Sequence, residues 1–166
     1  MEKLLIMVLL ANLMGAGEIN KNKAPVITAE KEIPTVINVI VPKKTIRRVS
    51  CTAYYAPLPK QKKYALGNYS RDVRMNGRGV ETSSGTKPEI GTIAADPAHY
   101  KRGTLLIVPG YGIGVVEDTG SVIKGKKRLD LFMGKGDDGL ESALDWGCKT
   151  LDIQEAEIVK VAIERK

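Results

Sequence analysis

Short runs of alternating apolar and polar residues follow one another along most of the chain. The first, in RRVSCTAYYAP, places Val49, Cys51 and Ala53 on one face, because side chains two positions apart in a β-strand point the same way. Similar runs are GTIAAD, TLLIV, GIGVVED, RLDLF, KTLDI and EIVKVAI, and glycine separates several of them. About seven short strands divided by turn residues predict an all-β fold, a small β-barrel.

One turn between these strands has a specific signature. VPGYG places Pro109 and Gly110 at the two central positions of a type II turn, since proline fixes φ and glycine accepts a positive φ. The strand patterns on either side are therefore predicted to form a hairpin.

One helix is predicted, over DDGLESALDWG. Asp137 or Asp138 is expected to cap its start, and Gly147 to end it. The residues expected to face the core are Leu140, Ala143 and Leu144. Trp146, beside Gly147, is expected to close the barrel as a core residue.

The N-terminal third has a different organisation. An apolar stretch over residues 4–14 follows Lys3 and precedes small residues at 15–17. It is shorter than the roughly 20 residues that span a bilayer, so residues 1–17 are predicted to be a secretory signal, with a buried first helix or an uncleaved anchor as the alternatives. Residues 18–47, with three prolines and one β-branched run, are expected to form a linker with an extra strand at most. The barrel domain is expected over 48–158 and a tail over 159–166.

The chain carries a net charge of +7. Its basic residues concentrate in two clusters, one of Lys43, Lys44, Arg47 and Arg48 and one of Lys124, Lys126, Lys127 and Arg128. No aromatic residues are interleaved with them as base stacking requires, so nucleic acid is not expected as a partner. An anionic cell-wall surface fits the charge equally well.

Two cysteines and one histidine limit the chemistry. Export would allow Cys51 and Cys148 to form a disulfide, and two separate buried thiols are the alternative. One histidine with two distant cysteines cannot assemble a zinc site, so neither a metal nor another cofactor is expected. His99 is expected to be a surface or capping residue.

Asp118 lies in an Asp-Thr-Gly turn, the signature of aspartic proteases. That chemistry needs two carboxylates sharing one proton, and the sequence has one such turn, preceded by the charged Glu117. A dimeric protease is therefore disfavoured.

Asp130 lies inside the apolar run RLDLF. Leu129 and Leu131 share one face, so Asp130 points to the other, with Arg128 and Phe132. A solvated strand face is one interpretation. The other is a poised proton donor, because burial and a nearby second carboxylate favour the neutral form of an aspartate.

The two carboxyl groups then divide their roles. If turn N–H groups and the Thr119 hydroxyl stabilise the Asp118 anion, Asp130 is the acid and Asp118 the anion, a division used in glycosidic chemistry. Asp96, in AADPAHY, is first expected to cap a turn or helix before Pro97. Lys124 is expected either as a solvated loop charge or as a group that neutralises a carboxylate or grips substrate.

The stretches SSGTKPEIGTIAADP, GTLLIVPGYGIGVVEDTG, IKG, RLDLF and ALDWG, in this order, closely resemble the 3D (three-aspartate) domain, which also forms the C-terminus of membrane-bound lytic transglycosylase A. The resemblance extends from about residue 49 to residue 153. It implies a six-stranded double-psi β-barrel with one or two short helices. It also implies an exported monomer, located in the cell wall, periplasm or extracellular space, that has no stable membrane span and acts on peptidoglycan glycan strands.

The family's three aspartates map onto Asp96, Asp118 and Asp130. The resemblance implies that Asp130 protonates the glycosidic oxygen between N-acetylmuramic acid and N-acetylglucosamine, then deprotonates the C6 hydroxyl to give a 1,6-anhydro sugar. Asp118 would tune Asp130 and stabilise positive charge, while Asp96 would order the groove. By position, Thr92 and Tyr55 are expected in the substrate groove.

Two departures from the family pattern bear on this site. One extra residue lies between the second and third aspartates, within GKKRLD, and either the loop absorbs it or a bulge turns Asp130 away. Ser121 and Val122 replace the usual small residues after Asp-Thr-Gly, which is expected to narrow the groove. The alternatives to a lytic transglycosylase are a non-catalytic, expansin-like glycan-binding barrel and a hydrolase that uses Asp130 and Asp118 with water.

Overall fold

The computed structural model describes residues 35–163. The predicted signal over 1–17, the first part of the linker and the last three residues lie outside this range. The strands are β1 (Thr35–Ala56), β2 (Thr92–Ala95), β3 (Leu105–Val108), β4 (Gly112–Asp118), β5 (Arg128–Lys135) and β6 (Lys149–Ile163). The helices are α1 (Tyr69–Asn76) and α2 (Gly136–Trp146). The boundary expected between linker and barrel, at residues 47 and 48, falls inside β1.

The six strands close into a barrel in the order β1-β5-β2-β4-β3-β6. The pairs β1/β5 and β2/β4 are parallel, and the other four are antiparallel. The predicted hairpin is confirmed, since β3 pairs with β4 and the Tyr111 N–H donates to the Val108 carbonyl across the turn at 3.0 Å. The all-β class and the six-stranded barrel are thereby confirmed.

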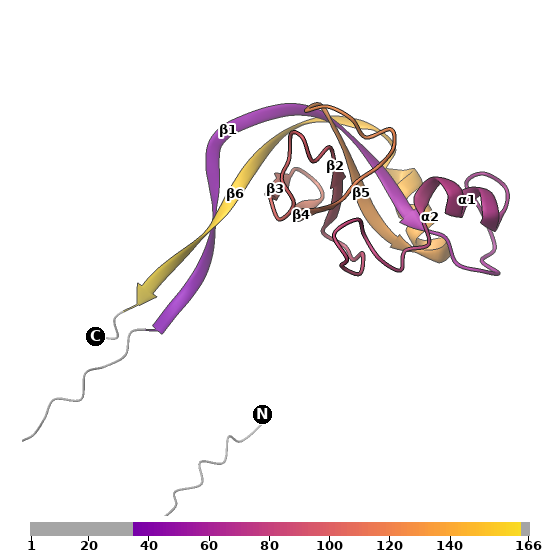
Figure 1. Cartoon of the computed structure of the whole chain (residues 1–166), viewed down its shortest axis with the longest axis horizontal. Coiled ribbons are helices and arrows are strands. Elements are labelled where there is room, and N and C mark those ends of the chain that lie inside the picture. The colour runs from indigo at the N-terminus through magenta and orange to yellow at the C-terminus, as the bar shows by residue number, and fades with distance from the viewer. Residues whose placement is uncertain (1–34, 164–166) are drawn as a thin grey trace, which may run out of the picture. The chain divides into compact units, whose positions relative to one another are not determined.

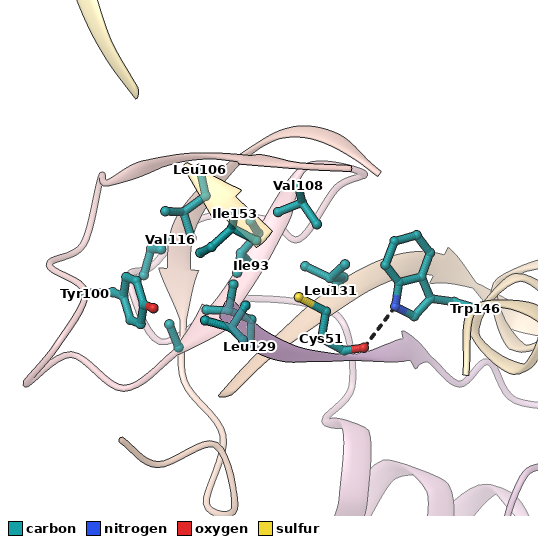
Figure 2. Packing of buried hydrophobic residues seen from close by; sticks show 12 residues of the cluster. Cys51, Ile93, Tyr100, Leu106, Val108, Val116, Leu129, Leu131, Trp146 and Ile153 are labelled. Atoms are coloured by element: carbon teal, nitrogen blue, oxygen red, sulfur yellow. Dashed lines mark hydrogen bonds between the residues drawn. The ribbon is translucent and has the colours of Figure 1, made fainter. Parts of the chain in front are cut away.

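Alternate residues of the strands fill the barrel, as Figure 2 shows. On β5, Leu129 and Leu131 are fully buried in this core, and on β1 Val49 and Cys51 lie beside them. Trp146 is largely buried in the same cluster and donates its indole N–H to the Cys51 carbonyl at 3.1 Å, so its predicted core role is confirmed. Because side chains alternate along a strand, residues between these positions point outward.

β1 and β6 continue as a two-stranded ribbon beyond the other four strands (Figure 1). Thr35 pairs with Ile163 at its far end, and the register shifts between Pro42 and Ile46. The apolar residues of this segment pair with one another across the two strands, as Ile40 does with Ile158. The extra strand allowed within the predicted linker is therefore present as the first part of β1, and its partner is the distant β6.

The helices differ from the sequence prediction in two ways. Helix α1 was not predicted, and α2 begins after Lys135 without a side-chain cap, so the expected cap at Asp137 or Asp138 is wrong. Asp137 instead accepts the backbone N–H groups of Lys62 and Lys63. Leu140 is buried as predicted, but Leu144 is 67% exposed.

Helix α2 contacts β5 through a pair of glycines. A β-carbon at Gly139 would lie 2.5 Å from the carbonyl carbon of Gly134. Replacing Gly139 by alanine would push α2 away from the strand, so Gly139→Ala is expected to lower the free energy of unfolding by about 1–2 kcal/mol net of the gain in helix propensity. Denaturant unfolding measures this loss.

The control for Gly139→Ala is Ser142→Ala, an exposed position in the same helix. Its stability is expected to stay within about 0.5 kcal/mol of the wild type. Equal stabilities for the two variants would contradict the close approach of α2 to β5.

Candidate active site

Four residues on four adjacent strands form one row across the barrel. Thr52 on β1 pairs with Asp130 on β5, Asp130 pairs with Ala94 on β2, and Ala94 pairs with Asp118 on β4. The small Ala94 side chain therefore lies between the two carboxylate-bearing positions. Adjacent strands are about 4.8 Å apart, which puts the backbones of Asp130 and Asp118 roughly 10 Å apart.

A register shift between β2 and β4 decides which acidic residue joins this row. Ile93 pairs with Val116, and the next residue, Ala94, pairs with Asp118, so Glu117 is skipped. The Glu117 carboxylate instead accepts hydrogen bonds from Thr86 and Thr92, both at 2.7 Å. The bulge thus places Asp118 in the row, whereas Glu117 forms structural hydrogen bonds with the two threonines.

The Asp118 carboxylate is held by three donors. Its Oδ1 accepts the backbone N–H groups of Ser83 at 3.0 Å and Thr119 at 2.8 Å, and its Oδ2 accepts the Tyr54 hydroxyl at 3.0 Å. The predicted turn N–H contribution is present at Thr119, while the side-chain hydroxyl that contacts Asp118 is that of Tyr54.

Asp130 is in a more apolar setting. Its Oδ1 accepts the Thr52 hydroxyl at 2.7 Å. The pKa of Asp130 is raised to about 6, with burial as the main cause. The Thr52 hydrogen bond lowers this pKa, the Asp118 charge raises it, and Arg128 lowers it. A carboxyl group with a pKa near neutrality can be protonated under mildly acidic conditions and act as a general acid.

Aromatic packing supplies much of this burial. Phe132, two residues after Asp130 on β5, is 1% exposed and packs against Tyr54 with the ring centres 5.3 Å apart, edge to face. Ala56 and Ala94 complete this small apolar cluster on the outer side of the barrel. Tyr54 therefore serves both as part of the apolar wall and as a donor to Asp118.

Asp130 and Asp118 open into the same cavity of about 310 Å³. Tyr54 and Ala94 line it beside them, and Arg74 and Asn76 of α1 form part of another side. The extra residue before Asp130 causes no bulge there, because β1 and β5 stay in register from Ser50 to Tyr54. The sequence departure is thus absorbed before β5. Of the two replaced residues after Asp-Thr-Gly, Ser121 lines the cavity and Val122 does not.

Asp96 lies outside the lining of this cavity. Its Oδ1 accepts the Ala98 N–H at 3.0 Å, and its Oδ2 accepts the Gly125 N–H at 2.7 Å. These backbone hydrogen bonds, the one from Gly125 first, lower the pKa of Asp96. Asp96 therefore joins its own turn to the loop that precedes β5.

Three further residues expected in the groove also lie outside the cavity lining. Thr92 is buried, and its hydroxyl bonds Glu117 and the Glu89 N–H. Tyr55 is buried and donates to Asp72, and burial is the main cause that raises its pKa to about 12. Lys124 is exposed.

Sequence reasoning missed Thr52 and Tyr54. The signal was present, because Val49 and Cys51 face the core and the alternation places Thr52 and Tyr54 on the outer side. The partner strand of β1, however, is β5, more than 70 residues away.

Cys51 and Cys148 are both free thiols. Cys51 is fully buried in the barrel core, and burial raises its pKa to about 11. Cys148 is exposed, with its Sγ 3.3 Å from the Ser50 Oγ.

The described residues define a closed six-stranded barrel with a cavity on its outer side, lined by the carboxylates of Asp118 and Asp130 and by a third, that of Glu81. Residues 91–153 match the model of the family described as the 3D domain, so this segment of the chain is similar to that family. The matched segment contains Asp96, Asp118 and Asp130.

Individual proteins are similar over parts of their length. YabE of Bacillus subtilis (strain 168), named as a cell wall shaping protein, is 40% identical over 67 residues, which cover 40% of this chain and 15% of YabE. The crystal structure of MltA from E. coli matches with 20% identity and a TM-score of 0.42 over 49% of this chain and 28% of that chain. A second E. coli MltA structure, described as revealing a lytic transglycosylase fold, gives 20% identity and a TM-score of 0.42. The match thus spans less than a third of each relative.

None of the described helices has the length and apolar character needed to cross a bilayer.

Proposed function

We propose that this chain is an exported cell-wall enzyme that cleaves peptidoglycan glycan strands as a lytic transglycosylase, with Asp130 as its single acid/base. The 3D-domain match supports the family's chemistry, and the cell-wall role named for YabE supports the compartment. The observation that carries the proposal is the partly buried Asp130, with a pKa raised to about 6, facing the same cavity as Asp118.

The first step is protonation of the leaving oxygen. Neutral Asp130 donates its proton to the glycosidic oxygen between N-acetylmuramic acid and N-acetylglucosamine as that C–O bond breaks. Positive charge develops on the muramyl ring, giving an oxocarbenium-like transition state. Asp118, fixed by Tyr54, Ser83 and Thr119, supplies the compensating negative charge from across Ala94.

The second step returns the proton to Asp130. The carboxylate formed in the first step accepts the proton of the C6 hydroxyl, whose oxygen bonds the anomeric carbon to close a 1,6-anhydro ring. An intramolecular hydroxyl needs no second base, because its effective concentration reaches about 10⁵–10⁸ M when it is well oriented. The acid is regenerated, and no water is consumed.

The donors around Asp118 favour this role over that of a base. Its Oδ1 already accepts two N–H groups and its Oδ2 accepts the Tyr54 hydroxyl. A carboxylate that activates water, as in an inverting hydrolase, needs a free lone pair directed at that water. Of the roughly four acceptor sites of the Asp118 carboxylate, these donors leave about one, on Oδ2. Asp96 acts in this proposal by fixing the loop before β5, and the site is complete within one chain, as a monomer requires.

Product analysis tests the proposal. Purified peptidoglycan is digested with the full chain and the fragments are identified by mass spectrometry. We expect anhydromuramyl ends. Reducing ends would instead indicate a two-carboxylate hydrolase, and retention of the chain on sacculi without fragments would indicate a binding barrel.

A further inference from the structure

The two basic clusters of the sequence meet at a second, larger cavity. It has a volume of about 590 Å³ and lies at the start of the barrel part of β1. Its lining consists of Arg47, Arg48, Val49, Ser50, Lys126, Lys127 and Thr150. Four of these seven residues are cationic, two carry hydroxyl groups and none is acidic. We refer to this site as the basic cavity.

The loop that carries the two lysines is fixed by hydrogen bonds. The Lys127 carbonyl accepts the Ser50 N–H at 2.9 Å, and the Lys126 carbonyl accepts the hydroxyl of Tyr100 at 2.8 Å. One residue earlier, Gly125 donates to Asp96 at 2.7 Å. The backbone positions of both lysines are therefore set before any ligand arrives, which reduces the entropy cost of binding.

The arginine side is also held in place. The Arg47 guanidinium lies over the buried ring of Tyr100, 5.8 Å from its centre, and contacts Glu155 at 3.2 Å. Its Nε atom is buried without a hydrogen-bond partner. Lys126 and Lys127, in contrast, form no ion pair with any residue of 35–163. Arg48 is also paired, with Asp152 at 3.6 Å. The uncompensated positive charge of the basic cavity therefore belongs to Lys126 and Lys127.

We propose that the basic cavity binds phosphodiester groups of a polyol-phosphate polymer of the cell wall. Arginine and lysine with nearby hydroxyls are the side chains that bind phosphate oxygens. Four cations spread over one cavity suit a chain of phosphates more than a single ion. Nucleic acid fits less well, because the lining offers no aromatic ring for a base and the nearby Tyr100 ring is buried beneath Arg47.

The position of the basic cavity relates it to the catalytic site. Ser50 precedes Thr52 on β1 by two residues, and Lys127 precedes Asp130 by three. These separations correspond to roughly 7–10 Å along the parallel strands. A polymer bound here would hold the barrel against the wall, beside the glycan strand to be cut. The assignment of the polymer to the cell wall rests on the proposed function, whereas the binding of phosphate does not.

Binding of a defined probe tests this proposal. Fluorescent poly(glycerol phosphate) is titrated with the full chain at several salt concentrations, beside oligo(dT) with the same number of phosphates. We expect poly(glycerol phosphate) to bind at least tenfold more tightly than oligo(dT). The double variant Lys126→Gln/Lys127→Gln is expected to bind it at least tenfold more weakly at low salt. Its salt dependence should also be shallower by roughly 1.4 log units per log unit of salt, about 0.7 for each lost phosphate contact.

The matched control is Lys62→Gln/Lys63→Gln. It removes the same charge from a different cavity, which Asp137 and Asp138 also line. We expect this control variant to lose less than threefold in affinity. Both double variants are expected to keep the thermal stability of the wild type. The phosphate site is refuted if the wild type does not bind or if both double variants lose affinity equally. Equally tight binding of oligo(dT) overturns the assignment to a polyol-phosphate polymer.

Different outcomes would overturn the phosphate site and the proposed glycan cleavage. The Lys126→Gln/Lys127→Gln variant is expected to cleave phosphate-free glycan strands at the wild-type rate. A wild-type chain that cleaves glycan but does not bind poly(glycerol phosphate) overturns the phosphate site alone. A chain that binds the polymer but leaves glycan intact overturns the proposed cleavage alone.

Discussion

Replacing Asp130 with asparagine is expected to reduce glycan cleavage about a thousandfold, within the 10²–10⁴ range that general acid–base catalysis contributes. The amide keeps the size of the side chain and still accepts the Thr52 hydroxyl. It cannot donate a proton to the glycosidic oxygen or take one from the C6 hydroxyl, so both proposed steps lose their catalyst. Release of soluble fragments from purified sacculi measures the loss, and pulldown on the same sacculi is expected to stay near wild type.

Two controls accompany Asp130→Asn. Asp145→Asn, an exposed position in α2, makes the same chemical change and is expected to retain full activity. The second is stability. Because the pKa of Asp130 is about 6 in the folded protein and about 4 in the unfolded chain, the free energy of unfolding falls as the pH rises from about 4 to 6. By pH 7.5 this decrease reaches up to about 3 kcal/mol.

Asp130→Asn removes that penalty, so the variant should be at least as stable as wild type at pH 7.5 and show no gain at pH 4. An active Asp130→Asn protein would remove Asp130 from its proposed role. An inactive but destabilised one would contradict the burial that raises its pKa.

The rate of cleavage is expected to fall about tenfold per pH unit above about pH 6. The acid must be protonated to act, and the pKa of Asp130 is raised to about 6, so the competent fraction decreases as pH rises through that value. Between pH 6 and pH 8 the rate should fall roughly fiftyfold to a hundredfold. Initial rates at low substrate concentration give the profile of the free enzyme.

Thr52 provides the matched test of this pH profile. Its hydrogen bond lowers the pKa of Asp130, so Thr52→Val should shift the decline to higher pH. Thr52→Ser keeps the hydroxyl and should restore the wild-type profile. If the cleavage rate of Thr52→Val falls at the same pH as that of the wild type, a group other than Asp130 controls the pH dependence.

Local patterns in the sequence were enough to predict part of this site. The alternation in RLDLF gave the outward direction of Asp130, because Leu129 and Leu131 must both reach the core. The type II turn at Pro109 and Gly110 depends only on the φ preferences of those two residues, and it predicted the β3/β4 hairpin.

The other features of the site depend on pairings between strands that are distant in the sequence. Local alternation places Tyr54 rather than Tyr55 on the outer side of β1, but only the pairing of β1 with β5 brings Tyr54 to the cavity. Likewise, the bulge that selects Asp118 over Glu117 is a property of the β2/β4 register. Residues 35–46 form a strand because β6 pairs with them.

Helix α1 illustrates a tertiary cause. Its sequence YSRDVRMN has no apolar stripe, and the residue it buries is Asp72. That carboxylate accepts the backbone N–H groups of Ala65 and Leu66 and the hydroxyl of Tyr55. A helix held by one buried acid carries no periodic signal that a sequence reading can detect.

The ribbon of β1 and β6 has a mechanical consequence. Thr35 and Ile163 are paired neighbours, so a pulling force applied through the two ends of the described chain acts on a single strand pair at a time. The eight residue pairs from Thr35 to Pro42 would separate one after another before the force acted on the closed barrel. Separation of the ribbon would thus lengthen the chain while the row of Thr52, Asp130, Ala94 and Asp118 stayed assembled.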